Sequence, residues 1–188
     1  MAERERIEVR SAGQLRQWLV ANHYQTESIW VVRYKKHSPF HLSWRDLVRE
    51  ALCFGWIDGQ AGRIDADRSQ QLLSPRRKGS HWSAINKQHV EELSRDGLIL
   101  PAGWAAIERA KSDGSWEWLD DIDQLLAPAD LLAGLDRLPD GRATWEAYPD
   151  SEKKGALHKL KACKRPATRA RWLATILDNT SRGQRTFT

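Results

Sequence analysis

The stretch WIDGQAGRIDADRSQQLLSP, residues 56–75, constrains the fold of this chain more than any other segment. Two strand-like runs flank the turn residues Asp65-Ala66-Asp67, and this pattern predicts a β-hairpin. Gly59 or Gly62 is expected to mark a bulge or a close approach of two backbones, because glycine has no side chain to obstruct one. A sheet is therefore expected in the first half of the chain.

Further elements are predicted around the hairpin. The apolar, β-branched segment SIWVVRYKK, residues 28–36, predicts one more strand. Ser11 is expected to cap a helix that ends near Asn22, and Ser43 to cap a second helix that Gly55 ends. The remaining helices of this half are expected over about residues 83–96, with Ile85, Val90 and Leu93 facing inward, and over residues 101–111.

The second half of the chain has helical patterns only. They are PADLLAGLDRL, GRATWEAY, a segment KKGALHKLKAC capped by Ser151, and ATRARWLATILDN, which Pro166 opens. We therefore expect the α+β class, with a small antiparallel sheet and packed helices in residues 1–111. An acidic linker over residues 112–126 and an all-helical unit over residues 127–188 would follow.

Charge is distributed unevenly along the chain. The formal net charge is +5, but residues 1–111 carry 18 cations and 13 anions, residues 112–150 carry 2 and 10, and residues 151–188 carry 10 and 2. We expect the acidic segment and the basic tail to lie against each other and largely cancel; otherwise the tail would be a surface for polyanions. The weak net charge and the acidic segment argue against nucleic acid as the partner.

Several classes of site find little support in the sequence. Cys53 and Cys163 form no CxxC pair, which suits a reducing compartment. His37 and His41 are separated by Pro39, and residues 65–76 lack the glycine and glutamate of a calcium loop. No metal site and no cofactor are therefore expected. The charged N-terminus and the lack of a long apolar run predict a cytoplasmic protein without a transmembrane segment.

The stretch LSPRRKGSHWSAINK, residues 73–87, is the strongest candidate for a site. Pro75 would fix the exit from the strand, Gly79 would permit a tight turn, and Ser80 or Ser83 would cap the following helix. A helix N-terminus beside arginine side chains attracts anions, and guanidinium binds phosphate or carboxylate through two hydrogen bonds. The competing interpretation is a solvated basic turn in which Trp82 packs into the core.

Residues 50–59 (EALCFGWIDG), 74–93 (SPRRKGSHWSAINKQHVEEL) and 101–116 (PAGWAAIERAKSDGSW) carry a family resemblance. Together they resemble the YdeI/OmpD-associated, or bacteriocin-protection, family over nearly the whole chain. LKACKRPATRARW, residues 160–172, is similar to the helical OmdA module of that family. The resemblance implies resistance to bacteriocins or antimicrobial peptides and a link to an outer-membrane porin, and it supplies no reaction or catalytic residue. Some members are periplasmic, whereas this sequence shows no export signal.

Three functions stay open at this point. The first is a non-enzymatic binding or stress-protection protein that holds a small anionic or aromatic ligand where the hairpin leads into the helix; a protein partner is a further option. Arg76 and Arg77 would clamp the anion there, Trp56 and Trp82 would form walls, and Asp58 would orient an arginine. The candidate ligand-binding residues are Trp56, Asp58, Arg76, Arg77, Lys78, Ser80, His81, Trp82, Ser83, Asn86 and Lys87.

The second function is an enzyme that uses Asp58 or Glu50 as general acid or base, with the arginine pair stabilising a developing anion. The sequence offers neither a nucleophile nor a metal site to support it. The third is nucleic-acid binding through the basic tail, which predicts an affinity that falls steeply with salt.

Overall fold

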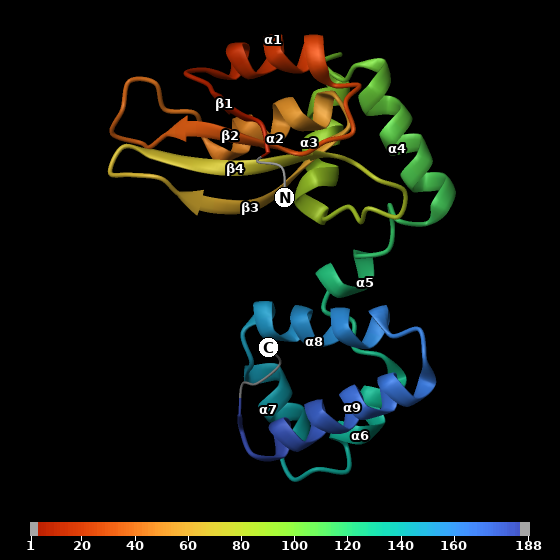
Figure 1. Cartoon of the computed structure of the whole chain (residues 1–188). Coiled ribbons are helices and arrows are strands. Elements are labelled where there is room, and N and C mark those ends of the chain that lie inside the picture. The colour runs from red at the N-terminus through yellow and green to blue at the C-terminus, as the bar shows by residue number, and fades with distance from the viewer. Residues whose placement is uncertain (1–3, 185–188) are drawn as a thin grey trace. The chain divides into compact units, whose positions relative to one another are not determined.

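The computed structural model describes residues 4–184, and the chain forms two compact units (Figure 1). The first unit ends at Glu117 and the second begins at Trp118. Within the predicted linker, residues 112–126, lie the end of helix α4 (Pro101–Asp113) and the short helix α5 (Asp120–Asp123). No helix among residues 4–184 is both long enough and apolar enough to cross a membrane.

The first unit contains a four-stranded sheet with the order β1-β2-β4-β3. The strands are β1 (Arg6–Glu8), β2 (Ile29–Tyr34), β3 (Trp56–Arg63) and β4 (Arg68–Pro75). The α+β class and the hairpin are confirmed, and the register shifts between Asp58 and Ala61, so the bulge includes Gly59. An antiparallel sheet was expected, but only part of the sheet is antiparallel. Strand β1 pairs in parallel with β2, and helix α1 (Ala12–Asn22) connects the two strands.

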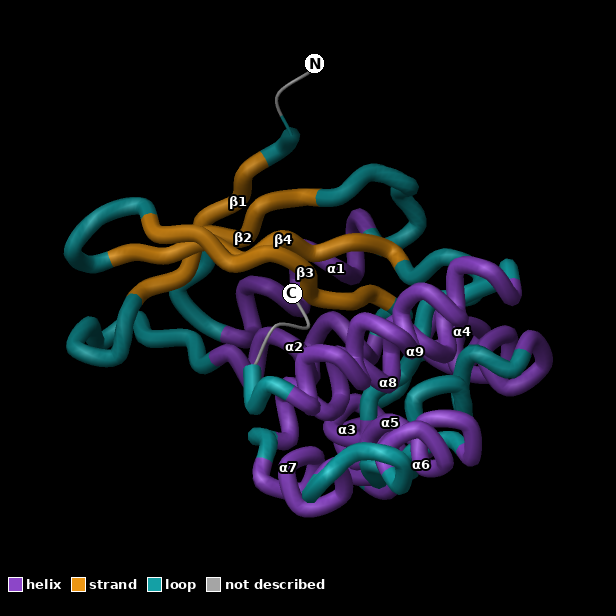
Figure 2. The backbone as a smooth tube through the Cα atoms, turned by 90° about the horizontal axis from the view of Figure 1, so that it is seen from below, coloured by secondary structure: helices purple, strands orange, loops and turns teal. Residues whose placement is uncertain are grey.

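Serine side chains cap the N-termini of three helices of this unit. Ser11, Ser43 and Ser83 each accept a hydrogen bond from a backbone N–H in the first helical turn, which satisfies a donor that has no partner within the helix. The helices that follow them are α1 (Ala12–Asn22), α2 (Trp44–Cys53) and α3 (Ala84–Arg95). Figure 2 shows α2 and α3 on one side of the sheet.

The core of the first unit lies between the sheet and these helices. Ile29, Val31 and Leu73 are fully buried on the helix-facing side of the sheet, and Leu47 of α2 is buried among them. Burial of apolar area of this kind is the main stabilising contribution to the fold. In α3 the expected inward positions 90 and 93 are buried, but Ile85 is 47% exposed, so the prediction for Ile85 was wrong.

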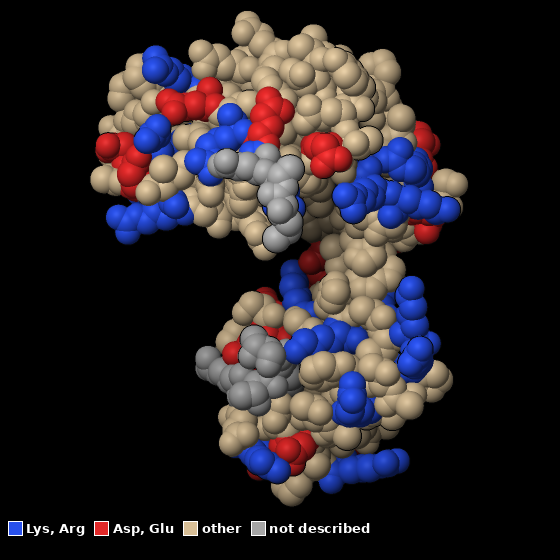
Figure 3. Space-filling model, in the orientation of Figure 1, with Lys and Arg blue, Asp and Glu red and all other residues tan. Residues whose placement is uncertain are grey.

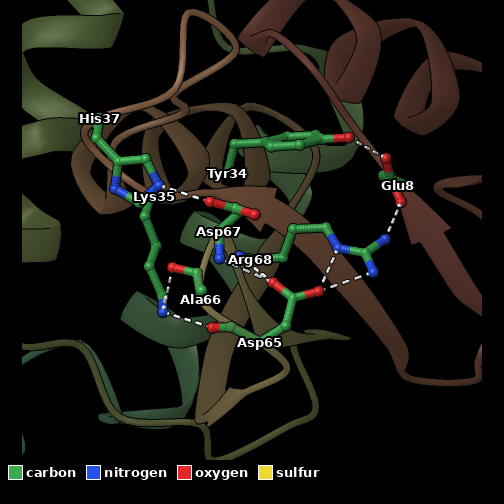
Figure 4. A network of polar contacts seen from close by, with 8 residues as sticks. All are labelled: Glu8, Tyr34, Lys35, His37, Asp65, Ala66, Asp67 and Arg68. Carbon is green, nitrogen blue, oxygen red and sulfur yellow. Dashed lines mark hydrogen bonds and ion pairs between the residues drawn. The ribbon is translucent and has the colours of Figure 1, made fainter.

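A polar network holds the far end of the hairpin (Figure 4). The Asp65 carboxylate accepts hydrogen bonds from the backbone N–H and the Nε of Arg68, which lowers the pKa of Asp65. The same arginine donates to Glu8 of β1, which also accepts the hydroxyl of Tyr34. Lys35 Nζ donates to the Asp65 carbonyl oxygen at 2.6 Å. This segment is therefore a turn, as the sequence predicts, and its carboxylates are engaged by the protein itself.

The second unit is helical. Its helices after α5 are α6 (Ala129–Leu135), α7 (Gly141–Ala147), α8 (Asp150–Ala162) and α9 (Pro166–Ser181). Pro166 opens α9 as predicted, but α8 begins at Asp150 and Ser151 lies inside it, so Ser151 is not the cap. Leu131, Trp145 and Leu160 belong to a separate apolar core.

Ion pairs within the second unit join the acidic segment to the basic tail. Lys154 contacts Asp123 at 2.9 Å and Lys161 contacts Asp121 at 2.6 Å. Arg169 donates to Asp130 at 2.9 Å across the start of α6. These three ion pairs confirm the prediction that the oppositely charged segments lie against each other. Opposite charges at such distances attract each other even in water.

Candidate functional site

The site is built on the segment that leaves β4. The Arg76 backbone N–H donates to the Gly55 carbonyl, which extends the β3–β4 pairing to the last residue before the turn. Gly79 has a φ of +75°, a conformation that L-residues with a side chain rarely adopt. Its N–H donates to the Asp113 carboxylate of α4 at 3.0 Å. The turn over residues 77–80 is thus fixed to the neighbouring helix.

Arg76 is a buried cation, with only 6% of its surface exposed. Its guanidinium carbon lies 3.6 Å from the ring centroid of Trp82, and Nη1 donates to the His81 carbonyl at 3.2 Å and to Ser80 Oγ at 3.4 Å. Nε and Nη2 are buried and have no hydrogen-bond partner within the described residues. Burial lowers the pKa of Arg76 to about 9, and the charge of Asp58 opposes that shift. The guanidinium therefore carries a desolvation penalty that its surroundings offset only in part.

Asp58 lies on the helix-facing side of β3. Its carboxylate accepts the indole N–H of Trp44, the first residue of α2, at 2.9 Å. Trp44 was not among the candidates, because nothing in a single sequence indicates that the start of this helix will face the strand. Glu50 of α2 has a different partner, Arg16 of α1, at 2.9 Å. The two carboxylates proposed for acid–base chemistry are therefore held by different cations and donors.

The two cationic residues that follow Arg76 lie on the solvent side of the same segment. Arg77 and Lys78 are exposed, and they line an open groove of about 440 Å³. We name it the β4–α3 groove; its other lining residues include Ser28, Ile57, Ser74 and Ser80. Figure 3 shows basic side chains gathered over this loop and the adjoining end of α4. Among residues 4–184, no carboxylate lines the groove.

The groove also gathers hydroxyl groups from distant segments. Ser28 Oγ and Ser74 Oγ lie 2.8 Å apart, since the start of β2 and the end of β4 are neighbours in the sheet. One of these hydroxyls donates to the other, so the second keeps a proton for another acceptor. Neither serine was a candidate from the sequence, because only the pairing of β2 with β4 brings them together.

The remaining predicted residues lie behind or beside the groove. Trp82 is 1% exposed and packs on Trp116 at 4.9 Å between ring centroids, as in the competing interpretation of a core tryptophan. Trp56 is equally buried, and its indole N–H donates to the His23 carbonyl.

Ser83 caps α3 through the N–H of Asn86, which is 7% exposed. The ammonium group of Lys87 lies 5.4 Å from the Trp116 ring centroid, and the His81 carbonyl accepts from Arg76.

The structure thus separates the predicted ligand-binding residues into two groups, one in the solvent-exposed groove and one in the interior. Arg77, Lys78 and Ser80 share one groove, whereas Arg76 and Trp82 stack on each other in the interior. Ser80 connects the two groups, because it lines the groove and its hydroxyl accepts from Arg76. No group of three or more His, Cys, Asp or Glu side chains within residues 4–184 could hold a metal ion.

Two family models match the chain. Residues 7–106 match a family described as a domain of unknown function (DUF8412), and these residues make up more than half of the chain. The chain belongs to the DUF8412 family. Residues 125–183 match the OmdA family, described as bacteriocin-protection, YdeI or OmpD-associated. No curated protein and no solved structure matches the chain significantly.

The two matches fall on different units of this DUF8412 member. The OmdA match confirms the suspected family and covers residues 125–183 of the helical unit. The GWIDG segment lies at the start of β3, and SPRRKG covers the end of β4 and the turn after it. Both segments fall inside the DUF8412 match and outside the OmdA match, so the OmdA match does not extend over nearly the whole chain, as the resemblance had been expected to do. The OmdA match suggests a role of the bacteriocin-protection type, and the DUF8412 domain contains the β4–α3 groove.

Proposed function

We propose that the chain is a non-enzymatic binding protein of the bacteriocin-protection type that holds a small anionic ligand in the β4–α3 groove. The observation that carries this proposal is the convergence of Arg77 and Lys78 with serine hydroxyls in a groove without a carboxylate. A volume of about 440 Å³ lies in the range of small-molecule sites. Two exposed cations in a groove lined by no carboxylate favour a negatively charged occupant; the nearby Asp113 carboxylate is bound to the Gly79 N–H and interacts with the charge of Lys78, and Arg77 supplies the second positive charge.

A carboxylate ligand suits the donors available. Arg77 is exposed and has no acidic partner within residues 4–184, so its planar guanidinium is free to bind a carboxylate through two parallel hydrogen bonds. The Ser28–Ser74 hydroxyl pair can donate one further bond, and Ile57 offers apolar surface to the body of the ligand.

Two contacts support a preformed site. Asp113 fixes the N–H of Gly79, and the interior guanidinium of Arg76 fixes the hydroxyl of Ser80. A turn that is already ordered loses little conformational entropy when a ligand binds. In this proposal Arg76 is a positioning residue, and the direct contacts come from Arg77 and Lys78.

The test is a titration of the ¹⁵N-labelled full chain with benzoate, followed by the amide signals of residues 77–80. We expect these signals to shift, and the Kd for benzoate to rise about tenfold in Arg77→Gln, since a charge-assisted hydrogen bond contributes about 1.5–3 kcal/mol. Arg63→Gln is the matched control, because Arg63 is an exposed cation of the same hairpin and is not part of the groove.

Two results would contradict the proposal. One is the absence of any shift in residues 77–80 at saturating benzoate. The other is an equal loss of affinity in Arg77→Gln and Arg63→Gln, which would show a general effect of net charge. Native mass spectrometry of the purified protein would then identify any retained small molecule directly.

A further inference from the structure

A second groove lies in the helical unit, where α8 turns into α9. It has a volume of about 490 Å³, and Lys159, Lys164, Arg165, Thr168 and Trp172 line it together with the turn. Three of these side chains are cations, and no carboxylate within the described residues lines the groove. We name it the α8–α9 groove.

The ion pairs of this unit explain why positive charge remains at that place. Lys154, Lys161 and Arg169 each contact an aspartate of the acidic segment, and Arg182 contacts Asp178. Lys164 and Arg165 have no ion pair within residues 4–184, and both side chains are exposed. Two adjacent uncompensated cations therefore remain at the turn between α8 and α9, and Arg171 of α9 is a further exposed cation without an ion pair within the described residues. Figure 3 shows basic side chains at several places on this face of the unit.

The chemistry of the groove fits one compact dianion. A phosphomonoester carries a charge of about −1.5 to −2 and three acceptor oxygens, which matches two or three cations and a hydroxyl donor such as Thr168. A carboxylate has half that charge and two acceptor oxygens, so it uses fewer of these donors. Lys159 Nζ lies 4.4 Å from the ring centroid of Trp172, so one face of this indole already holds a cation and is not open for stacking a base.

We propose that the α8–α9 groove binds a small phosphomonoester, with Lys164, Arg165 and Thr168 contacting the phosphate. Nucleic acid fits less well, because a strand follows a stripe of cations, whereas here most cations of the unit are paired. This site is independent of the β4–α3 groove, since it lies in the other unit and uses other residues.

The experiment titrates the ¹⁵N-labelled full chain with phenyl phosphate and follows the amide signals of residues 163–169. We expect saturable shifts there, weaker shifts with benzoate, and at least about a tenfold rise in the Kd for phenyl phosphate in the double variant Lys164→Gln, Arg165→Gln. Arg142→Gln is the matched control, because this exposed cation of the same unit is paired with Asp136 and lies outside the groove. Both variants change exposed side chains, and their far-UV circular dichroism should equal that of the unmodified chain.

Three outcomes would overturn the proposal. The first is no saturable shift in residues 163–169, and the second is an equal affinity of these residues for benzoate and phenyl phosphate. The third is tighter binding of a single-stranded oligonucleotide, with a log–log salt slope steeper than about −3, which would assign the groove to nucleic acid. Inorganic phosphate serves as a further arm: if it binds as tightly as phenyl phosphate, the groove recognises the anion and not its organic part.

Discussion

Replacing the buried Arg76 with methionine should stabilise the first unit by about 1 kcal/mol. The pKa of Arg76, lowered by burial to about 9 from above about 12, corresponds to a penalty of about 5 kcal/mol on the charged form. Arg76→Met removes that penalty and keeps an apolar, polarisable chain against the Trp82 ring. It also loses a desolvated cation–π contact of about 2 kcal/mol and the hydrogen bond from Arg76 to the His81 carbonyl, which contributes about 1–3 kcal/mol. The removed desolvation penalty thus exceeds the lost contacts by about 1 kcal/mol of stability.

The assay is hydrogen exchange of slowly exchanging amides in β2 and β4, which reports the global opening of this unit and not of the helical one. A gain of 1 kcal/mol slows their exchange about fivefold. Arg77→Met is the matched variant: its side chain is exposed, so its exchange rates should change by less than about 0.5 kcal/mol while benzoate binding is weakened.

Exchange that becomes faster by fivefold or more in Arg76→Met would refute this reasoning. It would show that the guanidinium stabilises the fold, and hence that its hydrogen bonds and its stacking outweigh the desolvation of the charge. A gain in stability accompanied by weaker benzoate binding would instead indicate that the buried charge is retained for the site, at the expense of stability.

Three further predictions concern two carboxylates of the first unit and two helical glycines, one in each unit. Asp58→Asn should lower the stability by about 1 kcal/mol in hydrogen exchange, and by less in the Arg76→Met background, because the carboxylate supports the buried charge. Hydrogen bonds from the Ser115 side chain and backbone and from the Gly79 N–H lower the pKa of Asp113, so its contribution is present above about pH 4 and is lost as the pH falls further. Amide shifts of residues 77–80 should therefore titrate below about pH 4, and Asp113→Asn should abolish that titration. Gly103→Ala should destabilise by about 2 kcal/mol in thermal unfolding, because its Cβ would lie 2.5 Å from the Cys53 carbonyl oxygen, whereas Gly155→Ala, with nothing within 4 Å, should stabilise by about 0.5–1 kcal/mol.

Local signals predicted most helices and strands correctly. The Ser11, Ser43 and Ser83 caps and the glycines that end α2 and α3 act within one helical turn, so a single sequence is enough to place them. Strand β1 was missed because three residues, RIE, carry no periodic pattern. Its place in the sheet depends on pairing with β2, which is distant in sequence.

The candidate site was predicted less completely than the fold. The sequence singled out the basic turn correctly as a cluster of charge, but it treated Arg76 and Arg77 as an equivalent pair. Neighbouring residues at the end of a strand point to opposite faces of the sheet, and here one face is the packed interior and the other is solvent. This alternation makes one arginine a buried support and the other a candidate ligand contact.

The sequence by itself determined the α+β class, the hairpin, the helical second half and the attraction between the acidic segment and the basic tail, because all four depend on local pattern or on net charge. The tertiary structure decided which charges stay unpaired. Lys161 and Arg169 are close to aspartates, whereas Lys164 and Arg165, only a few positions away, are not. Ion pairing depends on distances of a few ångströms between segments far apart in the chain, and composition cannot supply those distances.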